Sequence, residues 1–178
     1  MTETRKTYDH GNRDIAVNGE ILCGLVGSVA HGINLPGNDD YDYMSVYIEP
    51  PQYVAGVSAP LDHFISRTQP EGARSGAGDI DLTAYSLRKY LRLALAGNPS
   101  ILVLLYTPQV SNLTKLGDEL RQLAPKIVSM RAAHRFLGYL DGQRERMTGE
   151  GKRNRVPNRP ELIEKYGYDT KYASHALR

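Results

Sequence analysis

A buried apolar run that ends in a Gly-Ser turn constrains the fold of this chain more than any other feature. Residues 21–26, Ile-Leu-Cys-Gly-Leu-Val, form the run, and Gly27 and Ser28 follow it directly. A short apolar run bounded by a turn signal predicts a buried strand. The turn offers backbone N–H groups and a hydroxyl to an anion such as phosphate. The sequence therefore predicts a buried strand that leads into an anion-binding turn.

An alternating segment after this turn places two carboxylates on one face of a strand. Asp40 and Asp42 are separated by one residue, and side chains in a strand alternate with period 2. Two neighbouring carboxylates repel each other unless a cation lies between them, and oxygen-ligated Mg²⁺ is the usual cation. Residues 40–48 are therefore predicted to be a strand that begins at a metal site and continues into the core.

A third carboxylate is predicted from a second alternating segment, residues 79–85. Asp79, Asp81 and Thr83 share one face of this segment, so either acid can join the first pair from a neighbouring strand. A glycine-rich loop over residues 68–78 precedes the segment, and long loops in compact domains are often functional. A phosphate-binding turn beside a metal site is the chemistry of nucleotidyl transfer.

The rest of the chain is predicted to be largely helical, apart from a possible short strand at residues 14–17. Apolar periodicity, caps and Pro or Gly boundaries predict helices over residues 87–96, 101–105, 114–123, 130–140 and 160–166, and a last helix after Asp169. Lys171, His175 and Arg178 lie on one cationic face of that last helix. No C-cap follows it, which leaves open a continuation of the protein beyond residue 178.

The charge distribution separates an acidic part from a basic part. Residues 1–130 carry 11 Lys or Arg and 14 Asp or Glu, whereas residues 131–178 carry 11 and 6. A basic loop is predicted over residues 142–159. This asymmetry fits an enzyme whose C-terminal part handles phosphates or nucleic acid. A solvated basic surface explains it nearly as well, and the loop has few aromatic residues to stack on bases.

The chain has the sequence properties of a cytoplasmic protein. No apolar stretch approaches the roughly 20 residues of a membrane span, and the N-terminus lacks the apolar core of a signal peptide. Cys23 is the single cysteine, so no internal disulfide can form. A reducing cytoplasm is therefore the expected location.

Together these motifs resemble the DNA polymerase β-type nucleotidyltransferase superfamily, and most closely its predicted nucleotidyltransferases from bacteria and phages. The likeness covers roughly residues 20–178. It depends on five stretches: residues 27–32 (Gly-Ser-Val-Ala-His-Gly), 40–42 (Asp-Tyr-Asp), 81–89, 97–99 (Gly-Asn-Pro) and 165–171 together with His175.

The resemblance implies an α+β fold in which helices flank a mixed sheet, with a helical C-terminal part. We expect a catalytic domain over residues 1–110 and a helical, basic part over residues 111–178. The resemblance also implies a nucleoside triphosphate donor and Mg²⁺, with Mn²⁺ as an alternative cation.

The site residues follow from the family roles. Catalysis and metal binding are expected of Asp40, Asp42 and Asp81, with Asp81 as general base. Nucleotide binding is expected of Gly27, Ser28, His31, Lys89, Lys171, His175 and Arg178. Two alternatives stay open for single residues: His31 either touches phosphate or caps its loop, and Lys89 either faces the triphosphate or lies on an ordinary helix surface.

The chain departs from the family pattern in the spacing of its acids. The commoner spacing places the first acid twelve residues after the glycine, whereas Asp40 is thirteen residues after Gly27. Asp39 is therefore an alternative first ligand, although the spacing of Asp40 and Asp42 favours Asp40. Asp79 is likewise an alternative to Asp81 as the third carboxylate, and we favour Asp81.

Three functions are compatible with these features. The first is Mg²⁺-dependent transfer of a nucleoside monophosphate to an acceptor hydroxyl on RNA or tRNA, a protein or a small molecule, with release of pyrophosphate. The second is a catalytically weak nucleotide-binding regulatory module of the toxin–antitoxin type. The third is a basic RNA-binding adaptor with a decayed site. A third carboxylate is needed for transfer but not for simple binding, so we favour the enzyme.

Overall fold

A six-stranded mixed sheet forms the centre of the computed structural model, which describes residues 8–33, 40–148 and 159–177. Its strands, in the spatial order β1-β4-β5-β3-β2-β6, are β1 (Tyr8–His10), β4 (His63–Arg67), β5 (Ile80–Ser86), β3 (Tyr41–Tyr47), β2 (Glu20–Val26) and β6 (Val110–Leu113). Only β3 and β5 pair in parallel among these strands, and the other neighbours are antiparallel. The expected α+β fold with a mixed sheet is confirmed.

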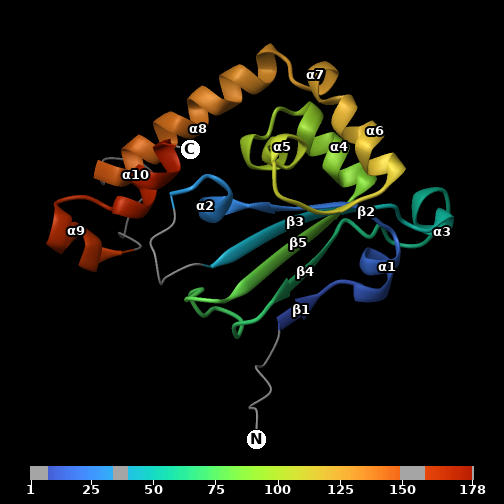
Figure 1. Ribbon diagram of the computed structural model, residues 1–178, viewed down its shortest axis with the longest axis horizontal. Helices are drawn as coiled ribbons and strands as arrows, with labels where there is room; N and C mark the ends of the chain where they lie inside the picture. Colours follow the sequence, from blue (N-terminus) through green and yellow to red (C-terminus); the bar gives the residue numbers. More distant parts are fainter. Residues whose placement is uncertain (1–7, 34–39, 149–158, 178) are drawn as a thin grey trace, which may run out of the picture.

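Helices cover both faces of this sheet (Figure 1). Their bounds are α1 (Arg13–Asn18), α2 (Gly27–Ala30), α3 (Pro51–Val54), α4 (Leu87–Leu95), α5 (Pro99–Tyr106), α6 (Lys115–Gln122), α7 (Ala124–Ile127), α8 (Met130–Thr148), α9 (Pro160–Tyr166) and α10 (Thr170–Leu177). The larger core cluster joins α4 to α8 with one face of the sheet, and the smaller joins α1 with the other face.

Side chains alternate between the two faces of the sheet along β3 and β5, and this alternation decides on which face each carboxylate lies. Met44 and Val46 belong to the larger cluster, whereas Tyr47 belongs to the smaller one. Asp42 has the same parity as Met44, so its side chain lies on the face that α5 and α8 cover. Asp81 has the same parity as Tyr85, which packs against the larger cluster. Both acids are therefore directed to the same side of the sheet.

Side-chain caps fix several of the helix starts that the sequence predicted. Ser86 accepts a hydrogen bond from Lys89 N at 3.3 Å, which begins α4. Asp169 Oδ1 accepts a hydrogen bond from Lys171 N at 3.0 Å, which begins α10. Such side-chain acceptors satisfy N–H groups that have no partner inside the helix.

Two local predictions were wrong. Residues 14–17, expected as a strand, belong to α1, because Asn12 Oδ1 accepts a hydrogen bond from Ile15 N at 3.0 Å and caps a helix there. Residues 142–148, expected to lie in the basic loop, continue α8, which buries Gln143. The other part of that predicted loop, residues 149–158, lies outside the described residues.

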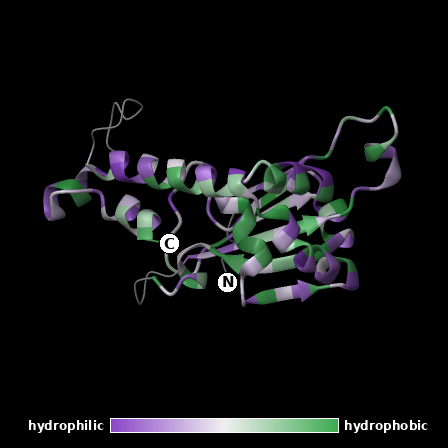
Figure 2. Ribbon diagram, turned by 90° about the horizontal axis from the view of Figure 1, so that it is seen from above, coloured by the Kyte–Doolittle hydropathy of each residue, from purple (hydrophilic) through white to green (hydrophobic). Residues whose placement is uncertain are grey.

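The C-terminal helices α8, α9 and α10 extend beyond the sheet at the end where α2 lies (Figure 1). Hydrophilic and hydrophobic residues alternate along these helices (Figure 2). In the described parts of the chain, no helix is both long and apolar enough to cross a membrane. The expected division after residue 110 stays a prediction. Strand β6, which begins at that residue and continues past it, pairs with β2.

The burial of β2 predicts an unreactive thiol at Cys23. Burial, together with the charge and hydrogen bond of Glu20, raises the pKa of Cys23 from 9.0 to about 12. Because the thiolate is the nucleophile, we expect alkylation at mildly alkaline pH to be at least about 100-fold slower in the folded protein than in urea. The buried thiol stabilises the fold fully below pH 9, and this contribution is lost as the pH rises toward about 12. Equal alkylation rates in both states would contradict the buried position of Cys23.

Candidate functional site

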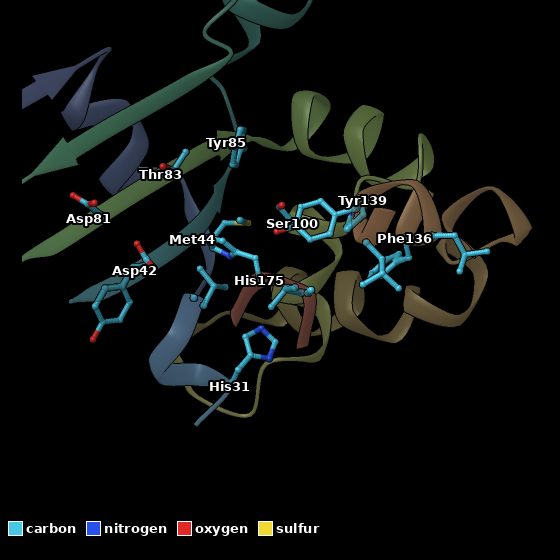
Figure 3. A pocket seen from close by; sticks show the side chains of 18 of the residues that line it. His31, Asp42, Met44, Asp81, Thr83, Tyr85, Ser100, Phe136, Tyr139 and His175 are labelled. Carbon is cyan, nitrogen blue, oxygen red and sulfur yellow. The ribbon is translucent and has the colours of Figure 1, made fainter. Parts of the chain in front are cut away.

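The strand order brings the Gly-Ser turn and two carboxylates to one edge of the sheet. The end of β2 meets the start of β3, because the two strands are antiparallel and Val26 pairs with Asp42. Asp42 in turn lies in register with Asp81, because β3 and β5 run in parallel. Figure 3 shows the two aspartates on these neighbouring strands. Three segments that are distant in the sequence thus form one site.

Gly27 lies directly against the carboxylate of Asp42. Its φ is +77°, a left-handed conformation that a side chain would strain. A Cβ atom at Gly27 would contact Asp42 Oδ2 and would lie 2.8 Å from Asp42 Cγ. Only glycine therefore allows the turn to approach the acid so closely.

A cavity of about 610 Å³ begins at this pair of acids. Gly27, Asp42 and Asp81 line its polar end, next to Val26. Its other walls come from β3, β5, α5, α8 and α10 and are largely apolar and aromatic (Figure 3). The lining side chains on these helices include Ser100, Val103, Phe136, Leu137, Tyr139 and His175. A concave site with apolar walls and a few convergent polar groups is typical of small-molecule binding.

The two candidate third carboxylates have different surroundings. Asp81 lines the cavity, accepts a hydrogen bond from Gln69 Nε2 at 2.8 Å and another from Ser75 Oγ at 3.0 Å. Asp79 instead accepts hydrogen bonds from Thr68 Oγ1 at 2.9 Å and from the Gly76 N–H at 2.8 Å. The carboxylate of Asp79 thus closes the loop between β4 and β5, whereas that of Asp81 faces the cavity.

The acids at this site suit a hard divalent cation in their chemistry. Carboxylate oxygens are the ligands that Mg²⁺ prefers, and Asp81 keeps acceptor capacity beyond its two hydrogen bonds. Across residues 8–33, 40–148 and 159–177, however, no group of three or more His, Cys, Asp or Glu is arranged to hold a metal. Asp40 is half-buried just before β3 and is not among the described lining residues. Asp42 and Asp81, the carboxylates that line the cavity, are therefore the residues that would hold a cation.

The fold places some of the other predicted nucleotide-binding residues at the cavity and others away from it. His31 and His175 line the cavity, His31 after α2 and His175 on α10. Lys89 lies away from it on α4, and its Nζ pairs with Asp62 Oδ2 at 3.1 Å. Lys89 thus forms an ion pair near the end of β5, whereas Asp81 lies near the start of that strand.

The remaining predicted residues do not line the cavity or cannot be placed. Ser28 belongs to α2 and Lys171 to α10, and neither is among the described lining residues. Asp39 and Arg178 lie outside the described residues.

Sequence reasoning missed the aromatic wall of the cavity. Phe136 and Tyr139 lie on α8, and Tyr85 lies on β5 facing the same space (Figure 3). Burial raises the pKa of Tyr85, so its phenol stays protonated and can donate a hydrogen bond. The apolar spacing of residues 133, 137 and 140 predicted a buried helix face. It did not reveal that this face borders a cavity.

Comparison with known protein families agrees with this architecture. The model of RlaP, the RNA repair pathway DNA polymerase beta family, matches residues 16–178. A comparison with curated proteins gives no match. The family match covers strands β2 to β6, the Gly-Ser turn, both cavity-lining aspartates and the C-terminal helices. The chain therefore belongs to the RNA repair pathway DNA polymerase β family, a polymerase β-like nucleotidyltransferase family.

Proposed function

We propose that this protein is a divalent-metal-dependent nucleotidyltransferase that moves a nucleoside monophosphate from a nucleoside triphosphate to an acceptor hydroxyl. The observation that supports it most is the register of Asp42 and Asp81 beside Gly27 at one end of the cavity. Two carboxylates and an anion-binding turn suit a triphosphate and its cation.

The proposed reaction forms one bond and breaks one. The acceptor oxygen bonds to the α-phosphorus, the bond between this phosphorus and the β-bridging oxygen breaks, and pyrophosphate leaves with the electron pair. Asp81 takes the proton of the acceptor hydroxyl. A cation held by Asp42 and Asp81 would neutralise charge on the triphosphate. The chain thus contributes mainly position and electrostatics.

The shape of the cavity supports one orientation of the nucleotide. The triphosphate would lie at Gly27 and Ser28, next to the carboxylates. The nucleoside would extend toward α5 and α8, where Phe136 and Tyr139 line the cavity. Aromatic rings are suited to stack on a base, and His175 lies on the α10 side of the same space.

An RNA hydroxyl is the acceptor that we favour. The description of the matching family names an RNA repair pathway. Residues 131–178 also carry 11 Lys or Arg against 6 Asp or Glu, a balance that suits contact with a phosphate backbone.

A second candidate is a nucleotide-binding regulatory module that binds without transfer. It is favoured by one observation: no three-ligand metal group is arranged among the described residues. Transfer needs a complete cation site, whereas binding alone does not.

Calorimetric titration of ATP, CTP, GTP and UTP, with and without Mg²⁺, tests the proposal without knowledge of the acceptor. We expect one or more triphosphates to bind at least about tenfold more tightly with Mg²⁺, and Asp42→Asn to abolish this gain. Asp118→Asn, on the exposed side of α6, is a matched control that should bind as the wild type does. Absence of binding by every triphosphate would rule out the transferase. Mg²⁺-dependent binding without pyrophosphate release in the presence of RNA would favour the regulatory module.

A further inference from the structure

We propose that Gln69 and Ser75 are positioning residues that hold the Asp81 carboxylate in the orientation a metal ion requires. This inference rests on the proposed function, because it assigns a purpose to the surroundings of one proposed ligand. Both residues belong to the loop between β4 and β5, whose glycine-rich composition was noted in the sequence.

Gln69, Ser75 and Asp81 form a closed ring of hydrogen bonds. Gln69 Nε2 donates to Asp81 Oδ1 at 2.8 Å and to Ser75 Oγ at 2.8 Å. Ser75 Oγ donates in turn to Asp81 Oδ2 at 3.0 Å. Each carboxylate oxygen thus has its own donor, and two donors on two oxygens fix both side-chain torsions of Asp81.

The buried side-chain amide of Gln69 donates a hydrogen bond to Asp81. Gln69 is 5% exposed, and an ionised carboxylate can only accept hydrogen bonds, so the amide must present its NH₂ group. This orientation leaves Gln69 Oε1 buried without a hydrogen-bond partner among the described residues. A buried acceptor without a partner is costly. Its presence is explained if the amide is required to orient Asp81.

The loop does not need this ring in order to close. Thr68 N donates to Ile80 O at 3.1 Å, and Asp79 is bonded to Thr68 and Gly76. The contacts of Gln69 and Ser75 with Asp81 are additional to these closing bonds. They therefore act on the carboxylate more than on the loop.

Neutral donors suit a metal ligand better than a cationic partner would. An amide and a hydroxyl orient the carboxylate without cancelling its charge, and they leave lone pairs for a cation. Arg67 Nε forms a long ion pair with Asp81 Oδ1 at 3.9 Å, beyond hydrogen-bond distance, so the hydrogen bonds to this carboxylate come from the two neutral donors. Asp42, the other proposed ligand, is closely approached by Gly27. Partners that orient metal ligands in this way commonly contribute 10- to 100-fold to metal affinity.

Binding of Mn²⁺ alone to the full chain, measured by the electron paramagnetic resonance of free Mn²⁺, tests this role without any turnover. We expect Ser75→Ala and Gln69→Met each to weaken Mn²⁺ binding about tenfold or more. Ser75→Thr keeps the hydroxyl and should restore binding to within about twofold of the wild type. Gln122→Met is the matched control, because Gln122 Nε2 donates to Asp118 Oδ2 at 2.7 Å on the exposed surface of α6.

Circular dichroism separates these effects from misfolding. Ser75 is half-buried, so Ser75→Ala removes one oxygen from a tolerant position and keeps the test open if Gln69→Met fails to fold. If a folded Ser75→Ala variant binds Mn²⁺ as tightly as the wild type does, the positioning role alone is overturned. Absence of Mn²⁺ binding by the wild type would overturn this role, whereas the Mg²⁺ dependence of triphosphate binding decides the proposed function separately.

Discussion

Asp42→Asn and Asp81→Asn are each expected to lower nucleotidyl transfer at least about 10³-fold, a loss of about 4 kcal/mol of transition-state stabilisation. Each substitution keeps the side-chain shape but removes the negative charge that faces the cavity. A cation site built on a pair of carboxylates loses its main attraction when one of them becomes neutral. Release of pyrophosphate from the triphosphate that binds, in the presence of RNA with a free 3′ hydroxyl, measures the rate.

Asp79→Asn is the informative comparison for this prediction. Its carboxylate accepts from Thr68 and Gly76 inside the loop, so we expect a decrease in rate of less than about tenfold, through the loop alone. Asp118→Asn, on the exposed side of α6, should leave the rate unchanged. A loss in Asp79→Asn as large as that in Asp81→Asn would contradict the choice of Asp81 as the third carboxylate.

Gly27→Ala is expected to damage both stability and nucleotide binding. A side chain at φ +77° is strained, and its Cβ would be driven into the Asp42 carboxylate. We expect a loss of about 2 kcal/mol or more in the free energy of unfolding, from strain and contact together. Displacement of Asp42 should also weaken Mg²⁺-dependent triphosphate binding at least about tenfold. Urea unfolding and calorimetry measure the two effects.

Gly72→Ala separates backbone strain from the contact with Asp42. Gly72 has nearly the same φ, +78°, but a Cβ there would meet nothing within 4 Å. We expect this variant to lose about 1 kcal/mol of stability and to bind triphosphate as the wild type does. Equal loss of binding in both variants would show that strain in the chain, rather than the approach of Gly27 to Asp42, causes the defect.

Local sequence signals were sufficient for most elements of the fold. The strand β2, the acid-bearing starts of β3 and β5, and the helix caps at Ser86 and Asp169 were all predicted from the residues themselves. Each of these depends on neighbours within about one turn or one pleat, where the chemistry of a few residues decides the conformation. The same signals misjudged residues 14–17, where the cap at Asn12 selected a helix.

The sequence alone therefore determined which residue types are available to a phosphate-binding turn and a carboxylate site. The tertiary structure decided which of them meet. The parallel pairing of β3 with β5 aligns Asp42 with Asp81, and the packing of α8 and α10 completes the cavity wall. In the same fold, Lys89 forms an ion pair with Asp62, and Asp79 accepts a hydrogen bond within the loop between β4 and β5. These outcomes depend on strand register and helix packing between residues far apart in the chain, which no local periodicity specifies.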